Sequence, residues 1–286
     1  MIKNPDDFLG RKDELRTIFN RLSNLQSCDV FGERKIGKSS LLYYIFLKLR
    51  DELGDDYRVA YIDMQDPKYH TVDGFLKYSL DKLGFDPKNI LPSNNLNENL
   101  IAFSDSIEDL RKEIKPVLLI DEFENLTKRP EKFNNDFFDA MRSLGSNGNI
   151  AYVTASLHAL KWLCIAGHFT SPFYNIFSQV PLGLFSPDET TEFLSVKREG
   201  VEFNEKEIKF IKRIAINHPL HLQIACSHVL KNRGKEYDEK KIRKDIEEEI
   251  KNFGDKWARR ERCIVKFIKY SINDVKEIIK SRLGKK

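Results

Sequence analysis

The segment GERKIGKS at residues 32–39 constrains this chain most, because it fits the pattern G-x-x-x-x-G-K-[ST] of a phosphate-binding loop. A short apolar run at 28–31 predicts a strand before the loop, and the apolar segment at 40–49 predicts a helix after it. Glycines let the backbone turn so that successive N–H groups point at phosphate oxygens, and the helix N-terminus adds partial positive charge. A glycine turn before a surface helix is the alternative, and the two matching flanks argue against it.

The loop supplies the first set of candidate binding residues. We expect the Lys38 ammonium to reach β- and γ-phosphates and the Ser39 hydroxyl to ligate Mg²⁺. The full set of candidate phosphate-binding residues is Gly32, Glu33, Arg34, Lys35, Ile36, Gly37, Lys38, Ser39 and Ser40.

A second landmark is the run PVLLIDE at residues 116–122, in which four apolar residues precede two acids. A continuous apolar run predicts a strand buried on both faces of a parallel sheet. At its carboxyl end Asp121 is expected to hold Mg²⁺ together with Ser39, and Glu122 to orient and deprotonate an attacking water. With Lys38, Glu122 is therefore a candidate catalytic residue. The alternative is a strand that ends in a solvated acidic turn.

The order of predicted elements indicates an α/β fold. Predicted strands alternate with predicted helices, which favours a five-stranded parallel sheet with helices on both faces and a ligand at the carboxyl ends of the strands. Thr154 and Ser156 end one strand and are candidates to contact the γ-phosphate or the attacking water, or else they cap the next helix. The expected strands are 28–31, 57–63, 116–122, 149–156 and 175–184.

After residue 187 the pattern becomes helical. Helices are predicted at 187–198, 204–216, 219–232, 238–252, 257–270 and 272–283. The sequence therefore divides into an α/β domain at 1–184, an all-helical lid domain at 185–252 and a short basic segment at 253–286, which is a candidate for part of a winged helix.

Charge is distributed unevenly along the chain. The net charge is +4, yet residues 251–286 carry +8 and the first 250 residues carry −4. A basic tail favours an anionic partner such as nucleic acid, an acidic protein surface or a membrane face, and a solvated helical face is the alternative. We expect no signal peptide and no membrane span, because the N-terminus lacks an apolar core and apolar runs are short. Four isolated cysteines predict neither a zinc site nor disulfides, so the expected location is the cytoplasm.

Several segments together resemble one group of P-loop ATPases. The chain is similar to the STAND ATPases (signal-transduction ATPases with numerous domains) and to related archaeal-type AAA+-like ATPases, all of the additional-strand, catalytic-glutamate class. The segments that carry this resemblance are FLGRKDEL at 8–15, GERKIGKSSLL at 32–42, VLLIDEFE at 117–124, YVTAS at 152–156, SPFYNIF at 171–177, LFSPDET at 184–190 and NHPLHLQ at 217–223.

This resemblance implies a nucleotide site between the α/β domain and the helical lid, occupied by ATP or ADP with Mg²⁺. It implies adenine contacts from Phe8, Leu9 and Arg11, a further base contact from Pro219, and His218 near the phosphates. It also implies an arginine at the γ-phosphate, for which Arg129 and Arg142 are candidates. Arg34 in the loop could contact phosphate or a neighbouring domain, and a plain surface role is the alternative for all three.

The function that the resemblance implies is a nucleotide-dependent switch that hydrolyses ATP to ADP and phosphate under the control of self-association or an effector protein. One alternative is a nucleic-acid-binding AAA+-like ATPase that uses the basic C-terminal segment. Another is an interaction module that binds ATP without hydrolysing it.

Overall fold

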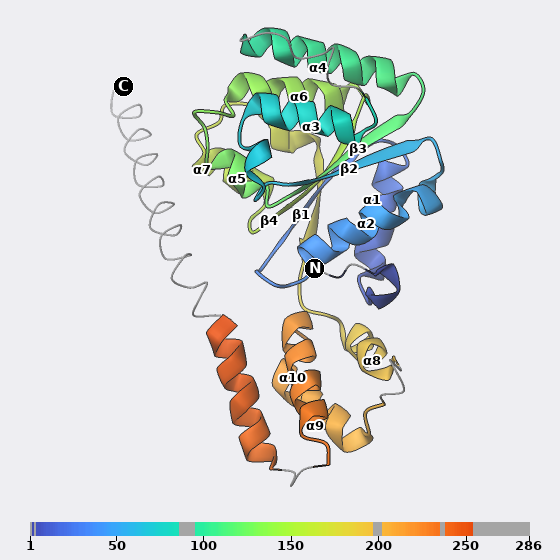
Figure 1. Cartoon of the computed structure of the whole chain (residues 1–286), viewed down its shortest axis with the longest axis vertical. Helices are drawn as coiled ribbons and strands as arrows, with labels where there is room; N and C mark the ends of the chain where they lie inside the picture. The colour runs from blue at the N-terminus through green and yellow to red at the C-terminus, as the bar shows by residue number, and fades with distance from the viewer. Residues whose placement is uncertain (1, 3, 86–94, 197–201, 235–237, 254–286) are drawn as a thin grey trace, which may run out of the picture. The chain divides into compact units, whose positions relative to one another are not determined.

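The computed structural model describes residues 2, 4–85, 95–196, 202–234 and 238–253 (Figure 1). The chain divides into two compact units, residues 1–183 and 184–286, which are described separately below. Apart from Phe253, the predicted basic segment at 253–286 and its two predicted helices lie outside the described residues.

The first unit is built on a parallel sheet of five strands in the order β2-β3-β4-β1-β5, as the sequence predicts. The strand β4 lies between β1, which leads into the loop at 33–37, and β3, which ends in Asp121. This intervening strand is the additional strand of the class that the sequence resembles. The strands are β1 (Ser27–Gly32), β2 (Tyr57–Asp63), β3 (Lys115–Asp121), β4 (Ala151–Ser156) and β5 (Phe177–Leu182).

Helices cover both faces of this sheet (Figure 1). One face carries α1 (Lys12–Leu22) and α2 (Lys38–Leu53), and the other carries α3 (Val72–Lys82), α4 (Leu96–Arg111) and α6 (Asn135–Ser146). Shorter elements are α5 (Glu124–Thr127), α7 (Leu160–Ala166) and the 3₁₀ turns η1 (Pro5–Asp7), η2 (Pro67–Tyr69) and η4 (Phe173–Ile176).

The sheet separates two apolar cores. Along β3, Val117 and Leu119 pack with α1 and α2, whereas Leu118 and Ile120 pack with the helices of the opposite face. Successive side chains of a strand point to opposite faces, so a strand covered on both sides must be apolar at every position. This is why the run before Asp121 shows no alternation of apolar and polar residues.

Several helices begin at a residue that a side-chain cap determines. The spacing of apolar residues alone locates these starts less accurately. The helix α6 begins at Asn135, because the Asn134 side chain accepts a hydrogen bond from the Phe137 N–H at 3.1 Å. Thr71 caps α3 in the same way through the Gly74 N–H. Such caps satisfy backbone donors that a helix leaves open at its first turn.

The second unit is helical throughout its described residues. It contains α8 (Pro187–Ser195), α9 (Glu205–Ala215), α10 (Pro219–Lys231) and a helix over residues 239–253. Capping boxes begin α8 and α9, in which Ser186 pairs with Glu189 and Asn204 pairs with Glu207. Its own apolar core includes Phe185, Phe210, Ile211, Leu222 and Ile246. None of the described helices in either unit combines the length and apolar character that crossing a membrane requires.

The junction between β1 and the loop at 33–37 packs tightly against β5. Gly32 pairs with Leu182 in parallel register. A Cβ atom added at Gly32 would lie 2.3 Å from the Leu182 carbonyl oxygen, closer than two such atoms can approach without a shift of backbone. Glycine is therefore required here by the close approach of two strands.

We predict that Gly32→Ala lowers the free energy of unfolding by about 1–3 kcal/mol, the usual effect of forcing an extra methyl group into a packed site. Urea denaturation measures the change. Gly183→Ala is the matched control, because an added Cβ there meets no heavy atom within 4 Å. Equal stability losses in the two variants would contradict this explanation.

Candidate functional site

The loop at 33–37 ends at Gly37, which is the N-cap of α2 with φ of 109°. No side chain caps this helix, and a Cβ atom added at Gly37 would meet no heavy atom within 4 Å. The first N–H groups of α2 therefore receive no acceptor from the side chain of the cap residue, and the space at the Gly37 Cα is open. Open N–H groups at a helix start, together with the helix dipole, form a cradle that suits a phosphate or another anion.

Lys38 is the first residue of α2 and lies over this loop. Its ammonium donates to the main-chain carbonyls of Gly32 and Glu33, each at 2.8 Å. Burial lowers the pKa of Lys38, and the negative charges of Glu124, Glu122 and Asp121 oppose that change. The geometry agrees with these effects: β1 and β3 are parallel with only β4 between them, so the loop lysine after β1 and the acids from Asp121 onward lie at the same edge of the sheet.

Asp121 is buried, and protein donors hold both of its carboxylate oxygens. Oδ1 accepts the Glu122 N–H at 2.9 Å, and Oδ2 accepts the Tyr61 hydroxyl at 2.7 Å. Tyr61 lies on β2, beside Leu119 in the register of the two strands. No local sequence pattern indicates a role for Tyr61, because it is the pairing of β2 with β3 that brings its hydroxyl to Asp121.

Glu122 has an unusual backbone for a residue that is not glycine, with φ of 53°. Burial raises the pKa of its carboxyl group, and the charges of Glu124 and Asp121 raise it further. A raised pKa makes a carboxylate a stronger base. Left-handed backbone in a non-glycine residue is costly and collects at functional sites.

Glu124 is a third acid at this edge, to which the sequence analysis assigned no role. It begins α5 and is 7% exposed. Its Oε2 atom has no hydrogen-bond partner among the described residues. Glu124 comes first among the charges that act on the pKa of Lys38 and of Glu122. The adjacent sequence FE after DE is the signal that would have pointed to it.

Thr154 and Ser156 lie on β4 and are fully engaged inside the protein. The Thr154 hydroxyl donates to Asp29 at 3.2 Å, and the Ser156 hydroxyl donates to the His158 carbonyl at 2.6 Å. Their exposed fractions are 0% and 1%, which leaves no surface for a phosphate. This arrangement favours structural roles over the expected phosphate contact. Neither residue caps α7, whose first N–H, at Leu160, is accepted by Asp29 at 2.8 Å.

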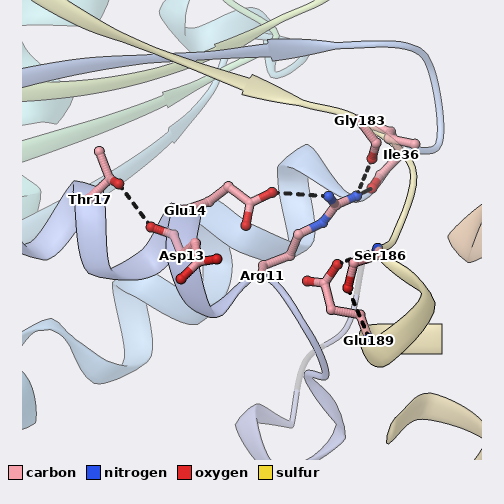
Figure 2. A network of polar contacts seen from close by, with 8 residues as sticks. All are labelled: Arg11, Asp13, Glu14, Thr17, Ile36, Gly183, Ser186 and Glu189. Atoms are coloured by element: carbon pink, nitrogen blue, oxygen red, sulfur yellow. Dashed lines mark hydrogen bonds and ion pairs between the residues drawn. The ribbon is translucent and has the colours of Figure 1, made fainter. Parts of the chain in front are cut away.

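The candidate adenine residues differ in their environments. The Phe8 ring stacks on Tyr44 of α2 at 4.6 Å between centroids, and Leu9 is half-buried. Arg11 is 3% exposed and donates to Glu14 and to the Ile36 and Gly183 carbonyls (Figure 2). Its guanidinium thus donates to protein acceptors, and the expected contact of Arg11 with a base stays a prediction.

The three candidate arginines are also distinguished by their surroundings. Arg129 donates to the Asn125 carbonyl at 2.6 Å, and the Arg142 Nε atom is buried without a hydrogen-bond partner among the described residues. The charge of Arg34 acts on the pKa of both Lys38 and Glu122. The structure therefore associates Arg34 with the loop and the acids.

His218 and Pro219 begin α10 in the second unit. The His218 Nδ1 atom accepts the Leu220 N–H at 3.2 Å, and its ring stacks on His221 at 4.1 Å between centroids. The proposed contacts of these two residues with a nucleotide stay predictions.

The sheet order, the uncapped loop and the acids after β3 together define a P-loop NTPase of the additional-strand class. The chain belongs to the family described as Novel STAND NTPase 2, whose model matches residues 22–259. No curated protein matches the chain.

Several solved structures share this fold. A Walker-type ATPase of Pyrococcus abyssi is 20% identical with a TM-score of 0.65, over 91% of this chain and 78% of that one. The ORC2 protein of Aeropyrum pernix, in ADPNP and ADP complexes, is 13% identical with a TM-score of 0.60, over 83% and 66%. The ORC1 protein of Aeropyrum pernix, in complex with DNA, is 12% identical with a TM-score of 0.57, over 85% and 66%. At these identities the likeness concerns the fold.

The buried carboxyl of Asp29 generates a prediction on stability. Burial raises its pKa from 3.8 to about 6. The folded state then binds this proton more tightly than the unfolded state, so the group stabilises the fold fully below pH 3.8 and loses this contribution as the pH rises through 6. The corresponding change in unfolding free energy is at most about 3 kcal/mol.

We expect the stability of the wild type relative to Asp29→Asn to fall between pH 4.5 and 7.5, as measured by urea denaturation at each pH. The variant removes the titrating group while keeping an oxygen for the Leu160 N–H. A difference between the two proteins that does not change with pH would contradict the assigned titration.

Proposed function

We propose that this protein is a Mg²⁺–ATP-binding ATPase that acts as a nucleotide-dependent switch. The observation that carries the proposal is the grouping of Lys38 with Asp121 and Glu122 beside a helix start that has no side-chain cap. A cradle of N–H groups, a cation for phosphate and carboxylates for a metal and a water form the set that phosphoryl transfer to water requires. Membership of the STAND NTPase family supports the same conclusion.

In this proposal the N–H groups of the loop bind the β- and γ-phosphates. Lys38 now donates to two loop carbonyls. It would exchange them for phosphate oxygens, which are stronger acceptors because they are charged. The Ser39 hydroxyl and Asp121 are oxygen donors, as Mg²⁺ prefers, and two protein ligands with waters and phosphates suit its usual coordination. When bound, Mg²⁺ would neutralise charge on the phosphates.

Glu122 is the proposed base for the attacking water. Its raised pKa improves its ability to accept a proton, and its left-handed backbone fixes the direction in which the side chain leaves the chain. Phe8 and Leu9 at the base and Arg34 near the phosphates complete the part of the proposed site that the first unit carries. Self-association or an effector protein would control turnover.

We predict that Glu122→Gln binds ATP with near wild-type affinity and hydrolyses it at least about a hundredfold more slowly, because the amide cannot accept the proton of water. Phosphate release and calorimetric ATP titration measure the two quantities. Glu131→Gln makes the same change at an exposed site and serves as the control.

Light scattering of the same samples with ADP and with ATP tests the switch. ATP-dependent assembly with slow turnover supports it. Wild-type turnover by Glu122→Gln would remove the assigned role, and ATP binding without hydrolysis by the wild type would indicate an interaction module.

A second prediction concerns Tyr61, which donates to Asp121. Tyr61→Phe keeps the ring and removes the hydroxyl, so Asp121 is less firmly oriented toward a metal. We expect the Mg²⁺ concentration for half-maximal turnover to rise about tenfold, whereas ADP affinity in EDTA stays unchanged.

Tyr57→Phe is the matched control. Tyr57 lies on the same strand, and its hydroxyl donates to the Leu22 and Ser23 carbonyls instead. The control should lose stability without a change in the Mg²⁺ requirement. An equal change in both variants would mean that Tyr61 acts through stability alone.

DNA is a second candidate partner. The net charge of +8 over residues 251–286 favours a polyanion, and the fold is shared with an ORC1 protein solved in complex with DNA. Binding of duplex DNA by the full chain should weaken steeply as salt rises, since bound phosphates release counterions. An absence of binding at low salt would exclude this candidate.

A further inference from the structure

Arg11 is fixed by acceptors from three separate parts of the first unit (Figure 2). Its Nη1 atom donates to Glu14 Oε1 at 3.1 Å, and its Nη2 atom donates to the Ile36 carbonyl at 3.1 Å and to the Gly183 carbonyl at 2.6 Å. Ile36 belongs to the phosphate-binding loop, whereas Gly183 directly follows β5. A planar guanidinium can serve several acceptors at fixed angles, which an ammonium cannot do.

The backbone before α1 is arranged to place this side chain. Gly10 and Arg11 both have left-handed backbone, with φ of 73° and 62°. Arginine seldom adopts this conformation, and it persists where surrounding interactions hold it. The three hydrogen bonds of the buried guanidinium provide those interactions.

The bond to Ile36 has a consequence for the next residue. In a trans peptide the carbonyl of one residue and the N–H of the following residue point in opposite directions, and the described residues contain no cis peptide. Because Arg11 holds the Ile36 carbonyl, the Gly37 N–H is directed away from Arg11. Gly37 is the N-cap of α2, with open space around its Cα. The guanidinium charge also polarises this peptide, so its N–H becomes a stronger donor.

The hydrogen bond to Gly183 connects the same Nη2 atom of Arg11 to the segment that directly follows β5. Gly183 is the last residue of the first unit, and β5 pairs with β1 up to Gly32 and Leu182. One nitrogen of Arg11 therefore contacts both the phosphate-binding loop and the chain that leaves the sheet. A displacement of Gly183 would change the position of Arg11 and with it the Ile36 peptide.

We propose that Arg11 is a positioning residue that orients the Gly37 N–H for the diphosphate of a bound nucleotide and couples this orientation to the chain leaving β5. This inference rests on the proposed nucleotide binding and adds a regulatory link to it. Coupling of this kind is reciprocal, so nucleotide binding should in turn steady the segment around Gly183.

Calorimetric titrations of the full chain with ADP, pyrophosphate and adenosine test the first part. In Arg11→Lys we expect the affinities for ADP and pyrophosphate to fall about tenfold, as the loss of one charged hydrogen bond predicts, and the affinity for adenosine to stay unchanged. Arg16→Lys is the matched control, because Arg16 lies on α1, the helix that Arg11 precedes, pairs with Asp13 at 3.2 Å and is 72% exposed.

Hydrogen–deuterium exchange tests the coupling. ADP should slow exchange at residues 33–39 and at residues 180–185 in the wild type and in Arg16→Lys. In saturating ADP, Arg11→Lys should still show slower exchange at residues 33–39, but it should no longer show slower exchange at residues 180–185. Thermal unfolding shows whether the variant is folded, and Glu14→Gln gives a milder test, since it keeps Arg11 and removes a carboxylate that is 22% exposed. That variant should weaken ADP and pyrophosphate binding in the same direction by a smaller factor.

The possible results are distinct. Weaker adenosine binding in Arg11→Lys would assign Arg11 to the base and overturn the inference. Unchanged ADP affinity in both folded variants would also overturn it while leaving the proposed function intact. A wild type that binds neither ADP nor ATP would reject the proposed function itself.

Discussion

The buried charges at the carboxyl edge of the sheet are the constraint on which the rest of the site depends. Asp121 and Glu124 are almost fully buried, and Glu122 lies between them in the sequence. Carboxylates brought together away from water repel one another, and a cation nearby offsets that repulsion. Lys38 supplies this cation, and it reaches the acids because β1 and β3 end at the same edge of one parallel sheet.

Hydrogen bonds from outside the two motifs keep this charged edge in place. Tyr61 on β2 holds Asp121, and Asp29 on β1 holds Thr154 and the first N–H of α7. The two hydrogen bonds of Asp29 are buried and that of Tyr61 is partly buried, so each pair lowers the penalty that an unpaired polar group would carry there. The positions of the reactive groups are thereby linked to the packing of neighbouring strands.

Strained backbone collects at the same region. Arg11, Lys35 and Glu122 each have positive φ: Arg11 donates to the phosphate-binding loop, Lys35 lies within that loop, and Glu122 directly follows β3. Such conformations are unfavourable for residues with a side chain, and tertiary contacts must hold them. In the second unit Ile216 and Asn217 form a similar pair immediately before His218. Four of the seven described non-glycine residues with positive φ therefore fall in segments that carry the family resemblance.

The sequence by itself determined the parallel α/β unit, the helical unit that follows, the phosphate-binding loop and the acidic end of β3. Apolar runs, glycine spacing and caps are local, so they remain legible in a single chain. Tertiary structure decided the partners of Asp121 and Arg11, the interior positions of Thr154 and Ser156, and the role of Glu124. These depend on strand order, on register and on a carbonyl 172 residues away from Arg11, which no local pattern encodes.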